Sequence, residues 1–298
     1  MNLNQTTTEE KLYQIIEHAD QLCKTFDSQS NCRRYLKEKL IGPNTTPIFL
    51  EMNKKTIGLA IIEIIDRYYG NLIVHTLDEE HEIRFANLLV TENFLGKNIL
   101  ELIQFRSNFN YRDEFIRLGL REKERVRMSH QNIAIFENTS DLPNITFVET
   151  TTNENKICGN ISFNAHKHRM HIECYDVYSS SENRTKFAND LREQKHGQTI
   201  KAACLIMKYK STPIGLIEVV HVNNFNQDMG WIMDIALLPE YQGMGYGKHL
   251  IKYSLSQLSK QGYTAAGLGV TLTNKNAHRL YESIGFEDYE NFVEIIGI

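Results

Sequence analysis

The segment that decides the fold is Met229-Gly230-Trp231-Ile232-Met233-Asp234-Ile235-Ala236-Leu237-Leu238, followed by Pro239-Glu240-Tyr241 and then by Gln242-Gly243-Met244-Gly245-Tyr246-Gly247. The first part is a nearly continuous apolar run, which is typical of a central strand buried on both faces. The last part is a glycine-rich turn beside Lys248. Because bare backbone can approach a ligand closely, such a turn running into a helix supplies the converging N–H donors that a pyrophosphate needs.

Regular elements flank this segment. Upstream, two β-rich runs separated by Lys210-Ser211-Thr212-Pro213 predict an antiparallel hairpin. Downstream, apolar residues at helical spacing predict two helices, ended by Gly262 and Gly285. The predicted order is hairpin 199–209 and 214–222, strand 229–238, glycine loop, helix 249–260, strand 264–272, helix 277–284 and a strand or hairpin over 286–296. This order predicts an α/β fold with a mixed central sheet flanked by helices, and ligands of open α/β sheets bind at the carboxyl ends of strands.

Other phosphate-binding loops fit this glycine pattern less well. A Walker loop has four residues between its glycines and a serine or threonine after its lysine, whereas only three residues separate Gly243 from Gly247 and His249 follows Lys248. A dinucleotide fingerprint reads GxGxxG after a first strand, whereas this loop reads GxGxG and comes late in its fold.

Two motifs together resemble one family. The segment Ile235 to Gly247 resembles the acyl-CoA motif of the GNAT superfamily, (Arg or Gln)-x-x-Gly-x-(Gly or Ala), placed after the fourth strand. Further on, Asn274-Lys275-Asn276-Ala277-His278-Arg279-Leu280-Tyr281-Glu282-Ser283-Ile284-Gly285-Phe286 is similar to the family's second motif, Asn-x-x-Ala-x-x-Leu-Tyr-x-x-x-Gly-Phe. The resemblance covers residues 144–298 well and implies an acyl-CoA-dependent N-acyltransferase that uses acetyl-CoA or another acyl-CoA as co-substrate.

The resemblance also implies roles for individual residues. The backbone of Ile235 and Leu237 would pair with the pantetheine arm, and Asn274 would hydrogen-bond the cofactor. Tyr281 would be the general acid, since a phenol can donate a proton to a departing thiolate. The residues that would hold the pyrophosphate are Gln242, Gly243, Met244, Gly245, Tyr246 and Gly247, assisted by Lys248.

A general base is harder to identify from the sequence. Asp234 lies in an otherwise apolar strand, where a carboxylate needs a partner. Glu218 lies on the preceding strand, and His221, three residues on, faces the opposite side. We therefore consider Asp234 first and Glu218 second as candidate bases, with a water chain as the alternative that the family also offers.

The first half of the chain resembles a degenerate copy of the same fold. The alternative is an unrelated α/β domain. Leu50 to Leu59 matches Met207 to Leu216, and Phe115 to Leu120 resembles Tyr281 to Phe286. We expect Ile83 to Val90 to be its buried strand and Glu92 to Lys97, with the single Gly96, to be its loop. Arg121 to Met128 resembles the family's closing strand. The predicted domains are 1–140 and 144–298, separated by a turn-rich segment.

Composition limits the classes of function. The 298 residues are 41% hydrophobic with a net charge of −4, so we expect two soluble cytoplasmic domains and no nucleic-acid partner. No segment is long and apolar enough to span a membrane, and the acidic N-terminus is unlike a secretory signal. A patch with Cys158, His166, His168, His171 and Cys174 matches no standard zinc spacing, so no metal is expected.

Two classes of function remain open. One is an active N-acyltransferase that acts on a primary amine of a small molecule, peptide or protein in a ternary complex, as a monomer or homodimer. The other is a non-catalytic protein that senses CoA or binds a partner on a GNAT scaffold. The intact glycines and Tyr281 favour the first.

Overall fold

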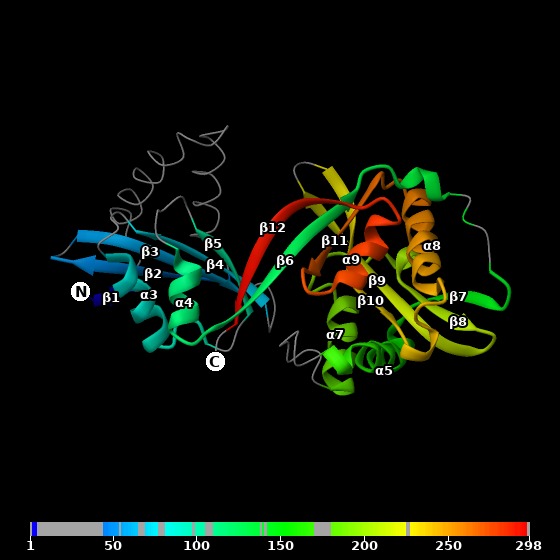
Figure 1. Ribbon diagram of the computed structural model, residues 1–298, viewed down its shortest axis with the longest axis horizontal. Helices are drawn as coiled ribbons and strands as arrows, with labels where there is room; N and C mark the ends of the chain where they lie inside the picture. Colours follow the sequence, from blue (N-terminus) through cyan, green and yellow to red (C-terminus); the bar gives the residue numbers. More distant parts are fainter. Residues whose placement is uncertain are drawn as a thin grey trace. The chain divides into compact units, whose positions relative to one another are not determined.

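The computed structural model describes residues 2–4, 44–53, 55–64, 69–76, 81–96, 99–104, 110–137, 139, 142–169, 180–224 and 227–296. The chain divides into two compact units, Met1–Lys123 with Phe292–Ile298 and Glu124–Asn291. Both combine a mixed sheet with helices, which confirms the predicted fold class (Figure 1). Within the described residues, no helix is long and apolar enough to cross a membrane.

The second unit contains the sheet predicted around the glycine loop. All neighbouring strands in it are antiparallel except β10 (Gln227–Leu237) and β11 (Ala265–Thr271), which are parallel. β10 is the predicted buried strand, and it lies in the middle of the sheet. The strand order is β6 (Arg121–His130), β11 (Ala265–Thr271), β10 (Gln227–Leu237), β9 (Thr212–Asn224), β8 (Leu205–Tyr209) and β7 (Ile145–Glu149).

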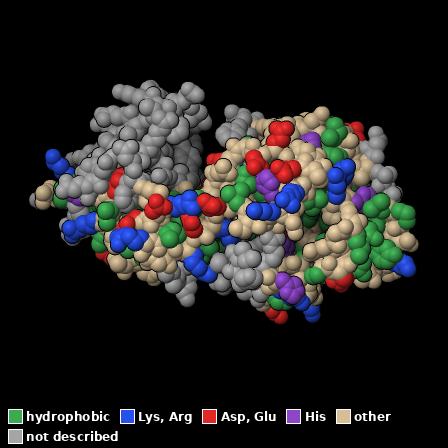
Figure 2. Space-filling view, in the orientation of Figure 1, with side chains coloured by type: hydrophobic (Ala, Val, Ile, Leu, Met, Phe, Trp, Pro, Cys, Tyr) green, Lys and Arg blue, Asp and Glu red, His purple; other side chains and the backbone are tan. Residues whose placement is uncertain are grey.

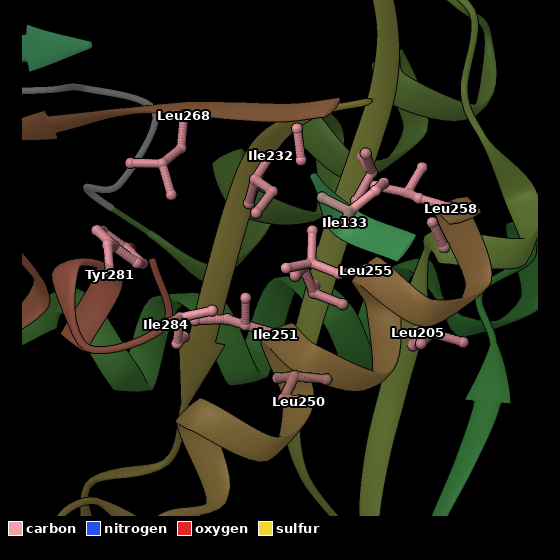
Figure 3. Close-up of a cluster of buried hydrophobic side chains, with 14 of the residues drawn as sticks. Ile133, Leu205, Ile232, Leu250, Ile251, Leu255, Leu258, Leu268, Tyr281 and Ile284 are labelled. Atoms are coloured by element: carbon pink, nitrogen blue, oxygen red, sulfur yellow. The ribbon is translucent and has the colours of Figure 1, made fainter. Parts of the chain in front are cut away.

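Helices cover both faces of this sheet. α8 (Tyr246–Lys260) and α9 (Lys275–Glu282) pack on one face, where Leu250, Ile251, Leu255 and Leu258 meet Ile232 and Leu268 in the main core (Figure 3). α5 (Asn155–His166) and α7 (Ser181–Arg192) pack on the other face, around Cys158, Ile161, Ala188, Ile206, Leu216 and Ala236. The short 3₁₀ helices are η2 (Ile133–Phe136), η3 (Thr152–Glu154), η4 (Lys167–Arg169), η6 (Lys201–Ala203) and η7 (Pro239–Tyr241).

The first unit has a core of its own, built from strands and two short helices. Its sheet runs in the order β1 (Asn2–Asn4), β2 (Thr45–Met52), β3 (Lys55–Ile64), β4 (Tyr69–Thr76), β5 (Ile99–Gln104) and β12 (Glu287–Ile296). Only β4 and β5 are parallel among these neighbours. The helices are α3 (Glu82–Thr91) and α4 (Tyr111–Arg117).

Two sequence predictions for this unit were wrong. The segment Ile83 to Val90, expected to be the buried strand, lies in helix α3. Phe85, Ala86 and Leu89 are the buried apolar residues, and their spacing is helical. The segment that begins at Glu92, expected to be the loop after a strand, therefore follows a helix, and the parallel strand of this unit is β5.

The two halves of the chain nevertheless follow the same plan. Each has three antiparallel strands, a helix, a parallel strand, a helix and a last strand. In the first hairpins, Leu50 lies opposite Gly58 and Met207 lies opposite Gly215, each next to an irregularity in register. The last helices end alike, since Gly119 and Gly285 both have positive φ. The chain thus contains two mixed α/β copies in tandem, as the weak repeat predicted.

The copies exchange their last strands. β6 belongs to the first half of the sequence, and its residues from Arg125 to His130 pair with β11 of the second unit. β12 belongs to the second half, and its residues from Glu294 to Ile296 pair with β5 of the first unit. The compact units therefore do not coincide with the predicted ranges 1–140 and 144–298.

Candidate active site

The glycine loop joins the end of β10 to the start of α8. Gly243 and Gly245 have φ of 75° and 85°, in the left-handed region that favours glycine. Gly245 is the N-cap of α8, and no side-chain hydrogen bond caps the helix there. A Cβ added to either glycine would meet no atom within 4 Å. The first N–H groups of α8, which have no acceptor within the helix, therefore lie beside open space where an anion fits.

Tyrosines hold both ends of this loop. Tyr241 precedes the loop and Tyr246 lies near its end, at the first residue of α8, and their ring centroids lie 6.4 Å apart. Tyr209 of β8 lies 6.3 Å from each of them. Hydrophobic side chains gather at the right-hand edge of the second unit in Figure 2, where Figure 1 places β7 and β8. These aromatic contacts hold the two ends of the loop, whereas Gly243 and Gly245 between them face open space.

A gap opens between β10 and β11 next to the loop. The parallel pairing of the two strands ends at Ile232 and Leu268, although β10 continues to Leu237 and β11 continues to Thr271. At the same point a bulge interrupts the pairing of β10 with β9, because Met233 has no partner between Ile232 and Asp234. A bulge bends a strand, so the end of β10 turns away from β11. The backbone N–H and C=O groups at this end of β10 can then pair with an extended ligand.

Tyr281 projects from α9 toward β11 near Leu268, on the side of the sheet that carries α8 (Figure 3). Its side chain is largely buried, at 7% exposure, and its ring lies 6.1 Å from that of Phe286. Asn274 is the N-cap of α9, and its side-chain oxygen accepts a hydrogen bond from the Ala277 amide at 3.3 Å. The two residues of the second motif thus lie on one short helix next to β11.

The other predicted cofactor residues lie around the loop, and two of their side chains bind the protein itself. The side-chain amide of Gln242 donates to the Leu237 carbonyl at 2.8 Å, which fixes the end of β10. Lys248 donates to the Ser283 carbonyl at 2.9 Å, so it bridges α8 and α9. Met244, at the tip of the loop, is 63% exposed. Ile235 and Leu237 lie on the part of β10 beyond the bulge.

The two candidate bases are both buried beneath α5 and α7. Asp234 forms an ion pair with Arg184 of α7 and accepts a hydrogen bond from Ser162 of α5 at 2.8 Å. Glu218 forms an ion pair with Arg192 of α7. Burial raises the pKa of Glu218 above its ordinary value, and Arg192 opposes that rise. To take a proton from an acceptor, either carboxylate would have to give up its arginine inside the core.

Sequence reasoning missed these two arginines. It required a partner for Asp234, because a carboxylate in an apolar strand needs one. It did not identify Arg184 and Arg192, which lie in a helix of low apolar content among other charged residues. Of the histidine-rich patch, His171 and Cys174 lie outside the described residues. Among the residues that are described, no group of three or more His, Cys, Asp and Glu could hold a metal ion.

Comparisons of sequence connect the chain to proteins of known family. Residues 172–286 match the model of the Acetyltransferase (GNAT) family. Over 82 residues the chain is 29% identical to "[Ribosomal protein bS18]-alanine N-acetyltransferase" of Escherichia coli strain K12, which is 28% of this chain and 55% of that relative. The relative of the same name from Haemophilus influenzae is 40% identical over 63 residues, 21% of this chain and 42% of its own length. The chain thus spans about half the length of the curated relatives it matches.

Comparisons of structure extend the likeness to the whole fold. A GCN5-related N-acetyltransferase from Sphaerobacter thermophilus aligns with a TM-score of 0.55 at 12% identity, over 99% of this chain and 94% of its own. A tandem GNAT protein from the clavulanic acid biosynthesis pathway aligns with a TM-score of 0.53 at 11% identity, over 99% and 98%. At such identities the likeness is one of fold alone, and it confirms the tandem arrangement.

Proposed function

On the premise that the second unit carries a GNAT-family domain, we propose that it transfers an acetyl group from acetyl-CoA to a primary amine by direct attack in a ternary complex. The observation that carries the proposal is the uncapped N-terminus of α8, placed at the end of the gap between β10 and β11. The loop amides from Gln242 to Gly247 would hold the pyrophosphate. The backbone of Ile235 and Leu237 would pair with the pantetheine arm, and the amide nitrogen of Asn274 would donate to the cofactor.

The departing thiolate needs a proton, and Tyr281 is the proposed donor. A phenol with an ordinary pKa of about 10 can protonate a thiolate whose conjugate thiol has a pKa of about 8.5 as the carbon–sulfur bond breaks. Tyr281 suits the role because it projects from α9 toward β11, beside the gap (Figure 3). Backbone N–H groups of β10 beyond the bulge are the proposed donors to the tetrahedral oxyanion.

The attacking amine must be neutral, and this condition bears on the acceptor. A lysine amine, with a pKa of about 10.4, is neutral in roughly one molecule in 2,500 at pH 7, a cost of about 4.6 kcal/mol. A peptide α-amine, with a pKa of about 7.7–8.0, is neutral in roughly one molecule in ten. Because Asp234 and Glu218 are both held by arginines, we propose that the ammonium proton is lost to solvent and that the acceptor is a peptide N-terminus. The relatives in Escherichia coli and Haemophilus influenzae are named as alanine N-acetyltransferases of a ribosomal protein, which supports this class of acceptor.

The test is acetyl transfer to a panel of peptides with free N-termini, matched peptides with blocked N-termini and free lysines, and small amines. Release of the CoA thiol and the mass of the acetylated product are both measured. The matched pair of controls is Gly245→Glu and Gly262→Glu. Both glycines have positive φ and open space around a Cβ, so the two substitutions introduce similar backbone strain. They lie at opposite ends of α8, and only Gly245 belongs to the proposed cofactor loop.

We expect wild type and Gly262→Glu to acetylate free N-termini and Gly245→Glu to fail at both binding and transfer. Binding of CoA without transfer to any acceptor would favour the sensing function, which needs the same loop. No binding of CoA by wild type would refute the proposed function.

A further inference from the structure

Two buried carboxylates lie side by side at the bulge of β10. Asp234 of β10 and Glu218 of β9 are direct partners in the register of the two strands. Both lie on the face covered by α5 and α7, and both are buried. Like charges opposite one another in a sheet destabilise it, and a buried carboxylate is tolerated only with a charged or hydrogen-bonding partner. A pair of acids at this place therefore requires a pair of cations.

One helix supplies both cations. Arg184 and Arg192 lie eight residues apart on α7, which is just over two turns, and each pairs with one of the two acids. The side chain of Arg184 is 1% exposed, and its Nε donates to the Ser162 hydroxyl at 2.7 Å. That hydroxyl donates in turn to Asp234 at 2.8 Å. Asp234 is thus held by α7 directly and by α5 through Ser162.

Asp234 is also the first residue of β10 beyond its bulge. Because Met233 is the extra residue, Ile232 and Ile235 both face the core under α8 and α9, and Asp234 faces α7. The parallel pairing of β10 with β11 ends at Ile232, so the gap begins where the bulge lies. The anchored residue therefore lies at the hinge between the paired part of β10 and the part that leaves β11.

The first unit shows the strand without this anchor. Its β4, Tyr69–Thr76, contains no Asp, Glu, Arg or Lys. The pairing of β4 with β3 has no shift in register, and β4 stays paired with β5 from Tyr69 to Val74. Where the charged anchor is missing, the two parallel strands stay together.

We infer that Arg184, through Asp234, is a positioning residue that holds the bulge of β10 and thereby keeps the cofactor gap open, with Arg192 and Glu218 as a second anchor. This role rests on the proposed function, and it removes Asp234 and Glu218 from consideration as bases. α7 then sets the shape of the cofactor gap from the opposite face of the sheet.

The test compares Asp234→Asn, Arg184→Lys and the double variant Asp234→Asn with Arg184→Gln in the full chain. Asp234→Asn keeps the size of the side chain, and the double variant also removes the buried positive charge that the single change leaves without its carboxylate. Asp228→Asn is the matched control, since it neutralises a surface carboxylate at the far end of the same strand. The measurements are affinity for CoA by calorimetry, kcat against pH, and hydrogen exchange of the amides of residues 233–238.

We expect Asp234→Asn to weaken CoA binding about 10- to 100-fold, as small displacements of a binding site do, and to leave the shape of the kcat–pH profile unchanged. Exchange at 233–238 should accelerate, Arg184→Lys should retain part of the affinity, and the double variant should recover most of it. A large loss of kcat with unchanged CoA affinity, a shifted pH profile and no recovery would make Asp234 a base and overturn the inference. Unchanged exchange at 233–238 would overturn it as well, and because exchange needs no CoA, this result is separate from failure of the proposed function.

Discussion

The two units share one plan and differ at the places where a cofactor would bind. In the first unit, β4 stays paired with β5 from Tyr69 to Val74, over the whole of β5, whereas β10 and β11 separate after Ile232 in the second. The loop after β10 has three glycines, and residues 77–80 after β4 are Leu, Asp, Glu and Glu. The helices that end at Gly119 and Gly285 terminate in the same way. This match aligns Phe115 of the first unit with Tyr281 of the second. A site of this kind thus depends on a few local departures from the fold and not on the fold itself.

Among the differences between the two units, the Tyr281 phenol is the one whose removal should lower activity the most. Tyr281→Phe makes the second unit like the first at this position, and we expect kcat to fall about 10²- to 10⁴-fold because the thiolate loses its proton donor. Affinity for CoA should stay at the wild-type value, and steady-state kinetics with calorimetry separate the two. Phe115→Tyr, the opposite change in the first unit, should leave turnover as it was. Wild-type kcat in Tyr281→Phe would place the acid elsewhere.

The buried charges of the second unit should dominate its stability. Arg192→Met leaves Glu218 buried without its arginine, and we expect a loss of about 3–5 kcal/mol in the free energy of unfolding. Lys195→Met, at an exposed lysine that pairs with Asp190 and Glu193, should cost much less, because solvent screens its charge. Urea unfolding followed by the fluorescence of Trp231, the only tryptophan in the chain, reports on this unit. Equal losses in the two variants would show that burial of the Glu218 pair has no energetic consequence.

The stoichiometry of CoA binding tests the comparison directly. We expect calorimetry of the full chain to give one CoA per chain, because among the described residues only those of the second unit show both the separated strands and the glycine loop. Gly245→Glu should then leave no residual binding. A second site that survives in this variant would mean that a closed pair of strands does not prevent cofactor binding.

The smallest expected effect is the contribution of His130 to the pH dependence of stability. His130 lies on β6, the strand of the first half that pairs within the second unit. Its Nδ1 accepts from the Asn132 amide at 3.2 Å, and burial lowers its pKa, although a bond to the Ile284 carbonyl and Glu287 oppose the shift. A lowered pKa means that the folded state binds the proton less well than the unfolded state. The stabilisation is therefore complete above the ordinary pKa of 6.5 and declines as the pH falls below it.

Urea midpoints at pH 7.5 and 5.5 measure this decline. His130→Gln should remove part of the pH dependence, whereas His221→Gln, at a partly exposed histidine, should keep it. An identical decline in wild type and His130→Gln would exclude His130 as its source.

Much of the second unit could be predicted because its signals are local. The apolar run of β10, the glycine loop and the spacing of Leu250, Leu255 and Leu258 each depend on neighbouring residues. The C-terminal glycines were also predicted correctly, since Gly262 and Gly285 have φ of 88° and 107°. The roles of the site residues stay predictions, because the structure shows their places and not their chemistry.

The wrong or missing predictions concern features whose partners are distant in sequence, or segments whose hydrophobic spacing fits both a helix and a strand. The apolar residues of α3 were interpreted as a strand because Ile83, Leu88, Leu89 and Val90 favour either state over so short a run. The ion pairs of Arg184 and Arg192 join residues 50 and 26 positions apart, and no pattern in either segment specifies the match. The exchange of β6 and β12 is invisible to any local pattern, because each strand pairs with a strand that is distant in sequence.

The exchanged strands have a consequence for how the chain is made. During synthesis the first unit emerges early, yet β5 lacks its outer neighbour until residues 294–296 of β12 have been added. An unpaired strand edge is a site for pairing with other chains, so the nascent protein carries this hazard through the making of the whole second unit. A nonsense or frameshift mutation in the codons for β12 would spare the glycine loop and Tyr281, and it would still leave the oldest part of the chain unfinished. The unit that is begun first is the last to be completed.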